Sequence, residues 1–246
     1  MMTQFPENEI GFLLRNLVGK IKQRKFFFLL MYVVIVFYLS IPSFIIPVLE
    51  YNKFRITSLM EERAIENCLI YYPRQSWVNI KDVNPNLIRC IVGLEDGRFF
   101  THKGIDWYEL NMSIRTNKRR RKIARGGSTI TMQVAKNLFL STDKNFFRKA
   151  KELLIAFRME KEISKQSILE NYLNAIEWGD GIFGVKEASE IYFKKEPDEL
   201  NINECCRMAA VIPSPLLHKP TDNSRYVLRR SARSRELYND VILPEL

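Results

Sequence analysis

The sequence predicts a mostly helical protein with one membrane-spanning helix near the N-terminus and one folded domain after it. Two observations support this prediction. Residues 26–49 contain no charged side chain, and a helix of roughly 20 apolar residues crosses a bilayer. Beyond residue 84, residues that favour helix starts precede apolar stripes of helical spacing. Sustained alternation of apolar and polar residues, typical of strands, is not found, and neither are internal repeats.

Composition limits the class of protein. With 246 residues, the chain can hold one good-sized domain and an anchor. Its 46% hydrophobic and 27% charged residues are typical of folded proteins. The net charge of +10 favours anionic partners such as phosphates, nucleic acid or acidic lipids. The four cysteines lack the paired spacing of a zinc site, so we expect buried thiols and no disulfide framework.

The charges around the apolar segment predict its orientation. Five Lys or Arg side chains lie between residues 15 and 25, whereas the charges after residue 49 are mixed. Positive flanks stay in the cytoplasm. We therefore expect a basic cytoplasmic tail at 1–25, a transmembrane helix at 26–49 and an extracytoplasmic domain at 50–246. A cleaved signal peptide is the alternative, but the apolar run is too long and lacks a small-x-small cleavage site.

We expect the rest of the chain to form helices joined by short loops. Residues 50–83 form a connector that closes at Tyr72-Pro73, and 177–184 is a Gly- and Asp-containing loop. Polar residues that accept hydrogen bonds from a first helical turn mark several helix starts. The expected cap residues are Asn84, Asp106, Ser128, Asn145 and Ser164. The expected helices are 85–94, 107–116, 129–140, one starting near 145, one starting after 164, 185–192, 203–212 and 224–240.

Residues 95–104 concentrate polar chemistry at the end of an apolar run. Glu95 and Asp96 follow the run 87–94 directly, and His102 and Gly104 come soon after. A carboxyl group at the edge of a core can have a pKa raised enough for proton transfer near neutral pH. On these ten residues alone, a helix ending in a solvated, charged turn is an equal alternative.

A basic, glycine-ended run at 117–127 leads into the next expected helix. Such runs are often solvated surface, but in a membrane-tethered chain they also attract lipid phosphates. Free backbone N–H groups at a helix start bind anions. Gln133 and Lys136 share one face of this helix, so a phosphate could be held here. A plain amphipathic helix is the alternative.

Five segments, in order, resemble the signatures of the peptidoglycan glycosyltransferases. The first is E-D-x-x-F-x-x-H-x-G, carried by Glu95, Asp96, Phe99, His102 and Gly104. The second, G-S-T-I-T-x-Q-x-x-K-N, covers 127–137; the third, R-K-x-x-E, covers 148–152; and the fourth, I-L-E-x-Y-L-N, covers 168–174. The fifth begins at Arg207. Together they cover about 85–220.

The resemblance implies a lysozyme-like, two-lobed helical fold and a reaction at the membrane surface. A growing lipid-linked glycan is transferred from undecaprenyl pyrophosphate onto lipid II, with inversion, to form β-1,4 strands. Glu95 is then the general base for the acceptor hydroxyl. Asp96, Phe99, His102 and Gly104 are expected to shape the loop, with a catalytic role for His102 left open.

The same resemblance implies a site for the leaving pyrophosphate. Charge compensation there would come from cations and a helix start. The expected binding residues are Ser128, Gln133, Lys136, Lys144, Arg148 and Lys149. Lys144 stands nearest a position that relatives commonly fill with arginine, so its role is open. Glu152, the second catalytic carboxylate, would orient Arg148 and Lys149 or hold a divalent cation (Mg or Mn). No cofactor is required by the sequence.

The expected enzyme is monofunctional, because the chain ends too soon for a transpeptidase domain and the S-x-x-K at Ser141–Lys144 has no K-T-G after it. Expected partners are lipid II, the lipid-linked glycan, anionic membrane lipid and a cell-wall synthesis complex, but not nucleic acid. The expected location is the cytoplasmic (inner) membrane. Two alternatives remain: a membrane-bound muramidase or lytic transglycosylase of similar fold, and a non-catalytic basic module.

Overall fold

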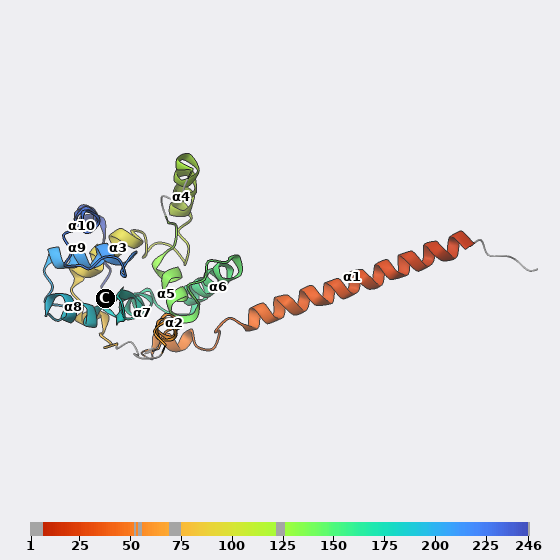
Figure 1. Cartoon of the computed structure of the whole chain (residues 1–246), viewed down its shortest axis with the longest axis horizontal. Helices are drawn as coiled ribbons and strands as arrows, with labels where there is room; N and C mark the ends of the chain where they lie inside the picture. The colour runs from red at the N-terminus through yellow and green to blue at the C-terminus, as the bar shows by residue number, and fades with distance from the viewer. Residues whose placement is uncertain (1–6, 52, 54–55, 69–74, 122–125, 246) are drawn as a thin grey trace, which may run out of the picture. The chain divides into compact units, whose positions relative to one another are not determined.

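The computed structural model describes residues 7–51, 53, 56–68, 75–121 and 126–245. The chain divides into two compact units, 1–43 and 44–246. The elements, labelled in Figure 1, are α1 Glu7–Leu39, η1 Pro47–Glu50, α2 Ser58–Glu66, η2 Ile80–Asp82, α3 Pro85–Glu95, α4 Trp107–Arg120, α5 Ile130–Phe139, α6 Phe146–Glu162, α7 Lys165–Ala175, β1 Glu177–Gly179, β2 Ile182–Phe183, α8 Val185–Phe193, α9 Ile202–Val211, α10 Arg225–Leu237 and η3 Tyr238–Asp240. The prediction of a mostly helical protein is confirmed.

The first unit contains α1. This helix ends at Leu39, ten residues before the predicted end of the apolar segment. Pro42 explains the early end, because proline cannot donate a backbone hydrogen bond and disfavours helical conformation in the residue before it. Most large apolar side chains between Phe26 and Leu39 are exposed. Within the described part of the chain, no helix combines the length and the apolar character needed to cross a bilayer.

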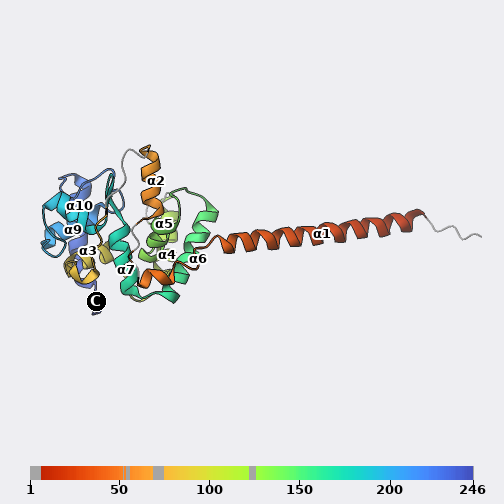
Figure 2. The ribbon, with the colours of Figure 1, turned by 90° about the horizontal axis from the view of Figure 1, so that it is seen from below.

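The second unit is built from two groups of packed helices (Figures 1 and 2). In one group, α3, α9 and α10 pack against one another. In the other, α5 packs against α6, α7 and α2. Trp178, Tyr172, Phe99 and Phe183 are the largest fully buried side chains. The second unit therefore has an extensive aromatic and aliphatic core, and the ends of α3 and α5 meet where the two groups adjoin.

Most expected caps are confirmed. The side chains of Asn84, Asp106, Asn145 and Ser164 each accept a hydrogen bond from a backbone N–H in the first turn of α3, α4, α6 and α7. The prediction for α5 was wrong by one residue. Thr129, not Ser128, caps α5 by accepting from the Met132 N–H at 3.3 Å. Its hydroxyl also donates to the Gly104 carbonyl, a contact that sequence spacing does not reveal.

Three further expectations need correction. The loop at 177–184 contains a short antiparallel hairpin of β1 and β2. The helix expected to end at Thr116 continues to Arg120, so part of the basic run is helical, while 122–125 lie outside the described residues. Cys68 is exposed, whereas the other three cysteines are buried as expected and all four are free thiols. Tyr72-Pro73 also lies outside the described residues.

Candidate active site

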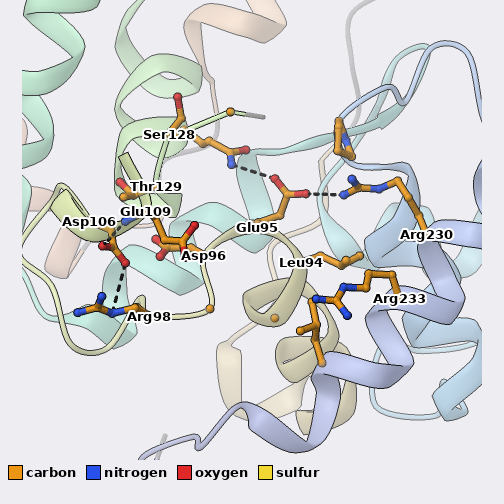
Figure 3. A pocket seen from close by; sticks show the side chains of 17 residues that line it. Leu94, Glu95, Asp96, Arg98, Asp106, Glu109, Ser128, Thr129, Arg230 and Arg233 are labelled. Atoms are coloured by element: carbon orange, nitrogen blue, oxygen red, sulfur yellow. Dashed lines mark hydrogen bonds and ion pairs between the residues drawn. The ribbon is translucent and has the colours of Figure 1, made fainter. Parts of the chain in front are cut away.

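A cleft of about 740 Å³ opens beside the C-terminal end of α3 and the N-terminal end of α5 (Figure 3). Four of the predicted site residues line it, namely Glu95, Asp96, Ser128 and Gln133. The remaining lining residues are Gly93, Leu94, Gly97, Arg98, Asp106, Glu109, Gly126, Gly127, Thr129, Pro213, Arg230, Arg233 and Leu237. Lys136, Lys144, Arg148, Lys149 and Glu152 do not line this cleft.

Glu95 is the last residue of α3, and its carboxylate is held from both sides. Gln133 Nε2 donates to one oxygen at 3.1 Å, and Arg230 Nη2 donates to the other at 3.1 Å. The side chain is only 11% exposed. Burial raises the pKa of Glu95 above its ordinary value, and the two donors partly oppose that rise. A carboxylate with these properties can accept a proton from a substrate hydroxyl.

A buried tyrosine fixes the Gln133 side chain. The Tyr172 hydroxyl on α7 donates to Gln133 Oε1 at 3.3 Å, which leaves the amide NH₂ group facing Glu95. Burial raises the pKa of Tyr172 well above its ordinary value, so this hydroxyl stays protonated and remains a donor. The chain Tyr172–Gln133–Glu95 therefore orients the carboxylate through two helices.

Asp96 connects the loop to α5. Both of its carboxylate oxygens lie 3.0 Å from His102 Nε2, and one also accepts from the Ile130 N–H at 2.9 Å. A carboxylate at a helix N-terminus is stabilised by the free N–H groups there. Asp96 therefore holds the start of α5 and the loop histidine together, which leaves Glu95 as the carboxylate that faces the cleft between two donors.

Gly104 and Phe99 support the same loop. Gly104 has φ +85°, a conformation that side-chain-bearing residues rarely adopt, and its carbonyl accepts from Thr129. The Phe99 ring is fully buried, in edge contact with the rings of Phe100 and His102. The loop is therefore anchored by packing and by backbone geometry.

A second cluster, which we call the basic cluster, surrounds Glu152 on α6. It contains Lys136, Arg148, Lys149 and Glu152. The Glu152 side chain is 3% exposed; one oxygen accepts from Arg148 Nη1 at 2.6 Å, and the other accepts from Lys149. Lys149 Nζ also donates to Ser128 at 3.1 Å, which connects the cluster to the cleft. Burial lowers the pKa of Lys136, and the Glu152 carboxylate partly opposes that shift.

The positions of two predicted site residues, Lys144 and Glu152, bear on the roles expected of them. Lys144 is exposed and does not line the cleft. Among the described residues, no three His, Cys, Asp or Glu side chains gather as metal ligands would. Both Glu152 oxygens are already taken by cationic side chains. Glu152 in this arrangement therefore does not fit a divalent cation.

Sequence reasoning missed three side chains that contact the site residues, namely Thr129, Tyr172 and Arg230. Arg230 also donates from Nε to the Ala210 carbonyl at 3.0 Å, which ties α10 to α9. Tyr172 lies in the fourth signature, and its apolar neighbours in the sequence predicted only a buried side chain. For Arg230, the only signal was the strongly basic character of the last helix.

Two comparisons with known proteins bear on the site. Residues 61–238 match the family model described as Transglycosylase. A biosynthetic peptidoglycan transglycosylase of Thiobacillus denitrificans is 40% identical over 171 residues, which are 70% of this chain and 74% of the relative. A protein of the same description from Laribacter hongkongensis is 38% identical over 198 residues, 79% of this chain and 87% of the relative. The matched range includes every residue of the cleft and the basic cluster.

Proposed function

The chain belongs to the transglycosylase family as a peptidoglycan glycosyltransferase of cell-wall synthesis, and we propose that it polymerises lipid II with Glu95 as the general base. The observation that carries the proposal is the position of Glu95. It is a largely buried carboxylate with a raised pKa, held at the edge of the 740 Å³ cleft by Gln133 and Arg230.

The proposed first step is attack by the acceptor's 4-hydroxyl on the anomeric carbon of the donor. A sugar hydroxyl is a weak nucleophile, so a base that takes its proton during attack lowers the barrier. Glu95 is the acceptor of that proton. Attack on an α-linked pyrophosphate from the opposite face gives a β-1,4 bond and expels undecaprenyl pyrophosphate.

The leaving pyrophosphate needs charge compensation more than a proton. We assign this role to Lys136, Arg148 and Lys149, with Ser128, the residue before the Thr129 cap of α5. The Lys149–Ser128 contact supports this assignment, because it connects the basic cluster to the cleft rim. Glu152 keeps Arg148 and Lys149 close together, because two neighbouring cations repel each other without a carboxylate between them. Gln133 is assigned to positioning Glu95.

We also propose that the apolar segment 26–49 holds the chain at the cytoplasmic membrane, with the N-terminus in the cytoplasm. The exposed apolar side chains between Phe26 and Leu39 support this, because water does not favour such a surface. The substrate is lipid-linked, so an enzyme held at the membrane meets it there. Protease protection of the N-terminal tail in sealed inverted vesicles would contradict this orientation.

The activity is tested with purified protein, labelled lipid II and separation of the products by size. We expect glycan polymer from the wild type and a loss of roughly 10²–10⁴-fold in Glu95→Gln, the range typical of general bases. Glu109→Gln, at another cleft-lining carboxylate, is the comparison variant and should keep far more activity than Glu95→Gln.

Two outcomes would replace the proposal. Cleavage of preformed glycan without polymerisation would indicate a muramidase or lytic transglycosylase. Retention of lipid binding with neither activity would indicate a non-catalytic module. Polymerisation that survives Glu95→Gln unchanged would keep the reaction but remove Glu95 as its base.

A further inference from the structure

Two thiols face each other where α3, α9 and α10 meet. Cys90 on α3 and Cys206 on α9 place their Sγ atoms 2.9 Å apart, and both side chains are buried. The Ser234 hydroxyl on α10 donates to the Cys90 carbonyl at 3.3 Å, so the third helix packs against the same point. Neither thiol takes part in the proposed reaction.

The pairing is selective among the four cysteines. Cys205 is adjacent to Cys206 in sequence but directs its thiol to the Leu200 carbonyl at 3.7 Å. Cys68 is exposed in the turn after α2. Cys90 and Cys206 are therefore the pair that helix packing has brought together, 116 positions apart along the chain.

We propose that Cys90 and Cys206 are an oxidation site that closes to a disulfide between α3 and α9. A disulfide bond is about 2.05 Å long, so the sulfur atoms need to approach by only about 0.9 Å. Compartments outside the cytoplasm supply disulfide oxidants, and the proposed function places the domain in one.

The reaction is a dithiol–disulfide exchange. The Cys206 thiolate attacks one sulfur of a small-molecule or protein disulfide, forms a mixed disulfide and expels one thiol. The Cys90 thiol then loses its proton and attacks Cys206 Sγ, which expels the second thiol. The chain loses two electrons and two protons, and the oxidant becomes two thiols. The hydrogen bond from Cys90 lowers the pKa of the Cys206 thiol to about 7, which favours Cys206 as the attacking sulfur.

The bond would lie close to the helix that carries Glu95 and to the carbonyl that holds Arg230. Cys90 precedes Glu95 by five residues on α3, about 7.5 Å of helix rise. Cys206 lies one turn before Ala210, whose carbonyl holds Arg230 against Glu95. Oxidation would therefore fix the relative position of the carboxylate and the guanidinium that stabilises it.

The test uses the full chain in detergent, incubated with glutathione disulfide a few degrees below its melting temperature, where local opening admits the oxidant. The protein is then denatured, free thiols are alkylated, and the peptides are identified by mass spectrometry. We expect a linked Cys90–Cys206 peptide with Cys68 and Cys205 alkylated. The oxidised chain should melt roughly 5–10 °C above the reduced chain.

Cysteine variants distinguish a Cys90–Cys206 disulfide from other cysteine pairings. Cys206→Ala and Cys90→Ala should each abolish the linked peptide and the dependence of melting on redox state, whereas Cys205→Ala should keep both. Alkylation of Cys90 and Cys206 in the oxidised wild type would overturn the proposal, and so would linkage of either residue to Cys68 or Cys205. The wild-type peptide map decides the question even where a variant folds poorly.

Discussion

Arg230→Met removes the guanidinium beside Glu95 and keeps an apolar stem in its place. A hydrogen bond between arginine and a carboxylate contributes about 1.5–3 kcal/mol. Little of this is lost to solvent screening, because the Glu95 side chain is 11% exposed and that of Arg230 is 28% exposed. The bond stabilises the ionised carboxylate, so its removal raises the pKa of Glu95 further above the ordinary value.

The base works only when ionised, so the acidic limb of kcat/KM against pH should move to higher pH. At pH values where Glu95 is mostly protonated in both enzymes, we expect kcat/KM of Arg230→Met to be roughly tenfold or more below that of the wild type, with recovery as the pH rises. Lipid II polymerisation is measured from pH 5 to 9. Arg235→Met, on an exposed position of the same helix, controls for loss of charge. An acidic limb that coincides with that of the wild type would refute this account of Arg230.

Three further predictions concern Tyr172, Gly104 and Glu152. Tyr172→Phe should lower kcat in the lipid II assay by roughly two- to tenfold, because Gln133 loses the hydroxyl that orients it. Gly104→Ala should lower the free energy of unfolding by about 1–2 kcal/mol in denaturant titration, because φ is +85° there; an unchanged midpoint would contradict it. Glu152→Gln should lower the stability by about 3 kcal/mol, seen as a lower melting temperature, because Arg148 loses its buried carboxylate.

Local signals predicted most helix boundaries. Asn145 and Ser164 each cap a helix that begins at the next residue, because their side chains satisfy backbone N–H groups that no upstream carbonyl can reach. The structure also brings together residues from different signatures, although the predicted site residue Lys144 is exposed and does not line the cleft. Glu95 and Gln133 are 38 residues apart and are hydrogen-bonded, and Arg148, Lys149 and Glu152 form one cluster.

Other features depend on packing that sequence spacing does not encode. Both Ser128 and Thr129 can cap a helix, and local preference slightly favours serine. Thr129 is the cap, and its hydroxyl also donates to the Gly104 carbonyl. Arg230 lies 135 residues after Glu95, and nothing local distinguishes it from other arginines of α10. Hydrogen-bond partners distinguish Glu95 from Asp96, because His102 and the Ile130 N–H occupy the Asp96 carboxylate. These partners come from packing and are not visible in the sequence.

The placement of Gln133 and Lys136 on α5 has a consequence for sequence change. The two residues are three positions apart, about 4.5 Å along the helix axis. One contacts the proposed base, and the other lies in the basic cluster assigned to the leaving group. An inserted or deleted residue between them would rotate one side chain by about 100° relative to the other. We expect that homologous enzymes keep the number of residues between these two positions.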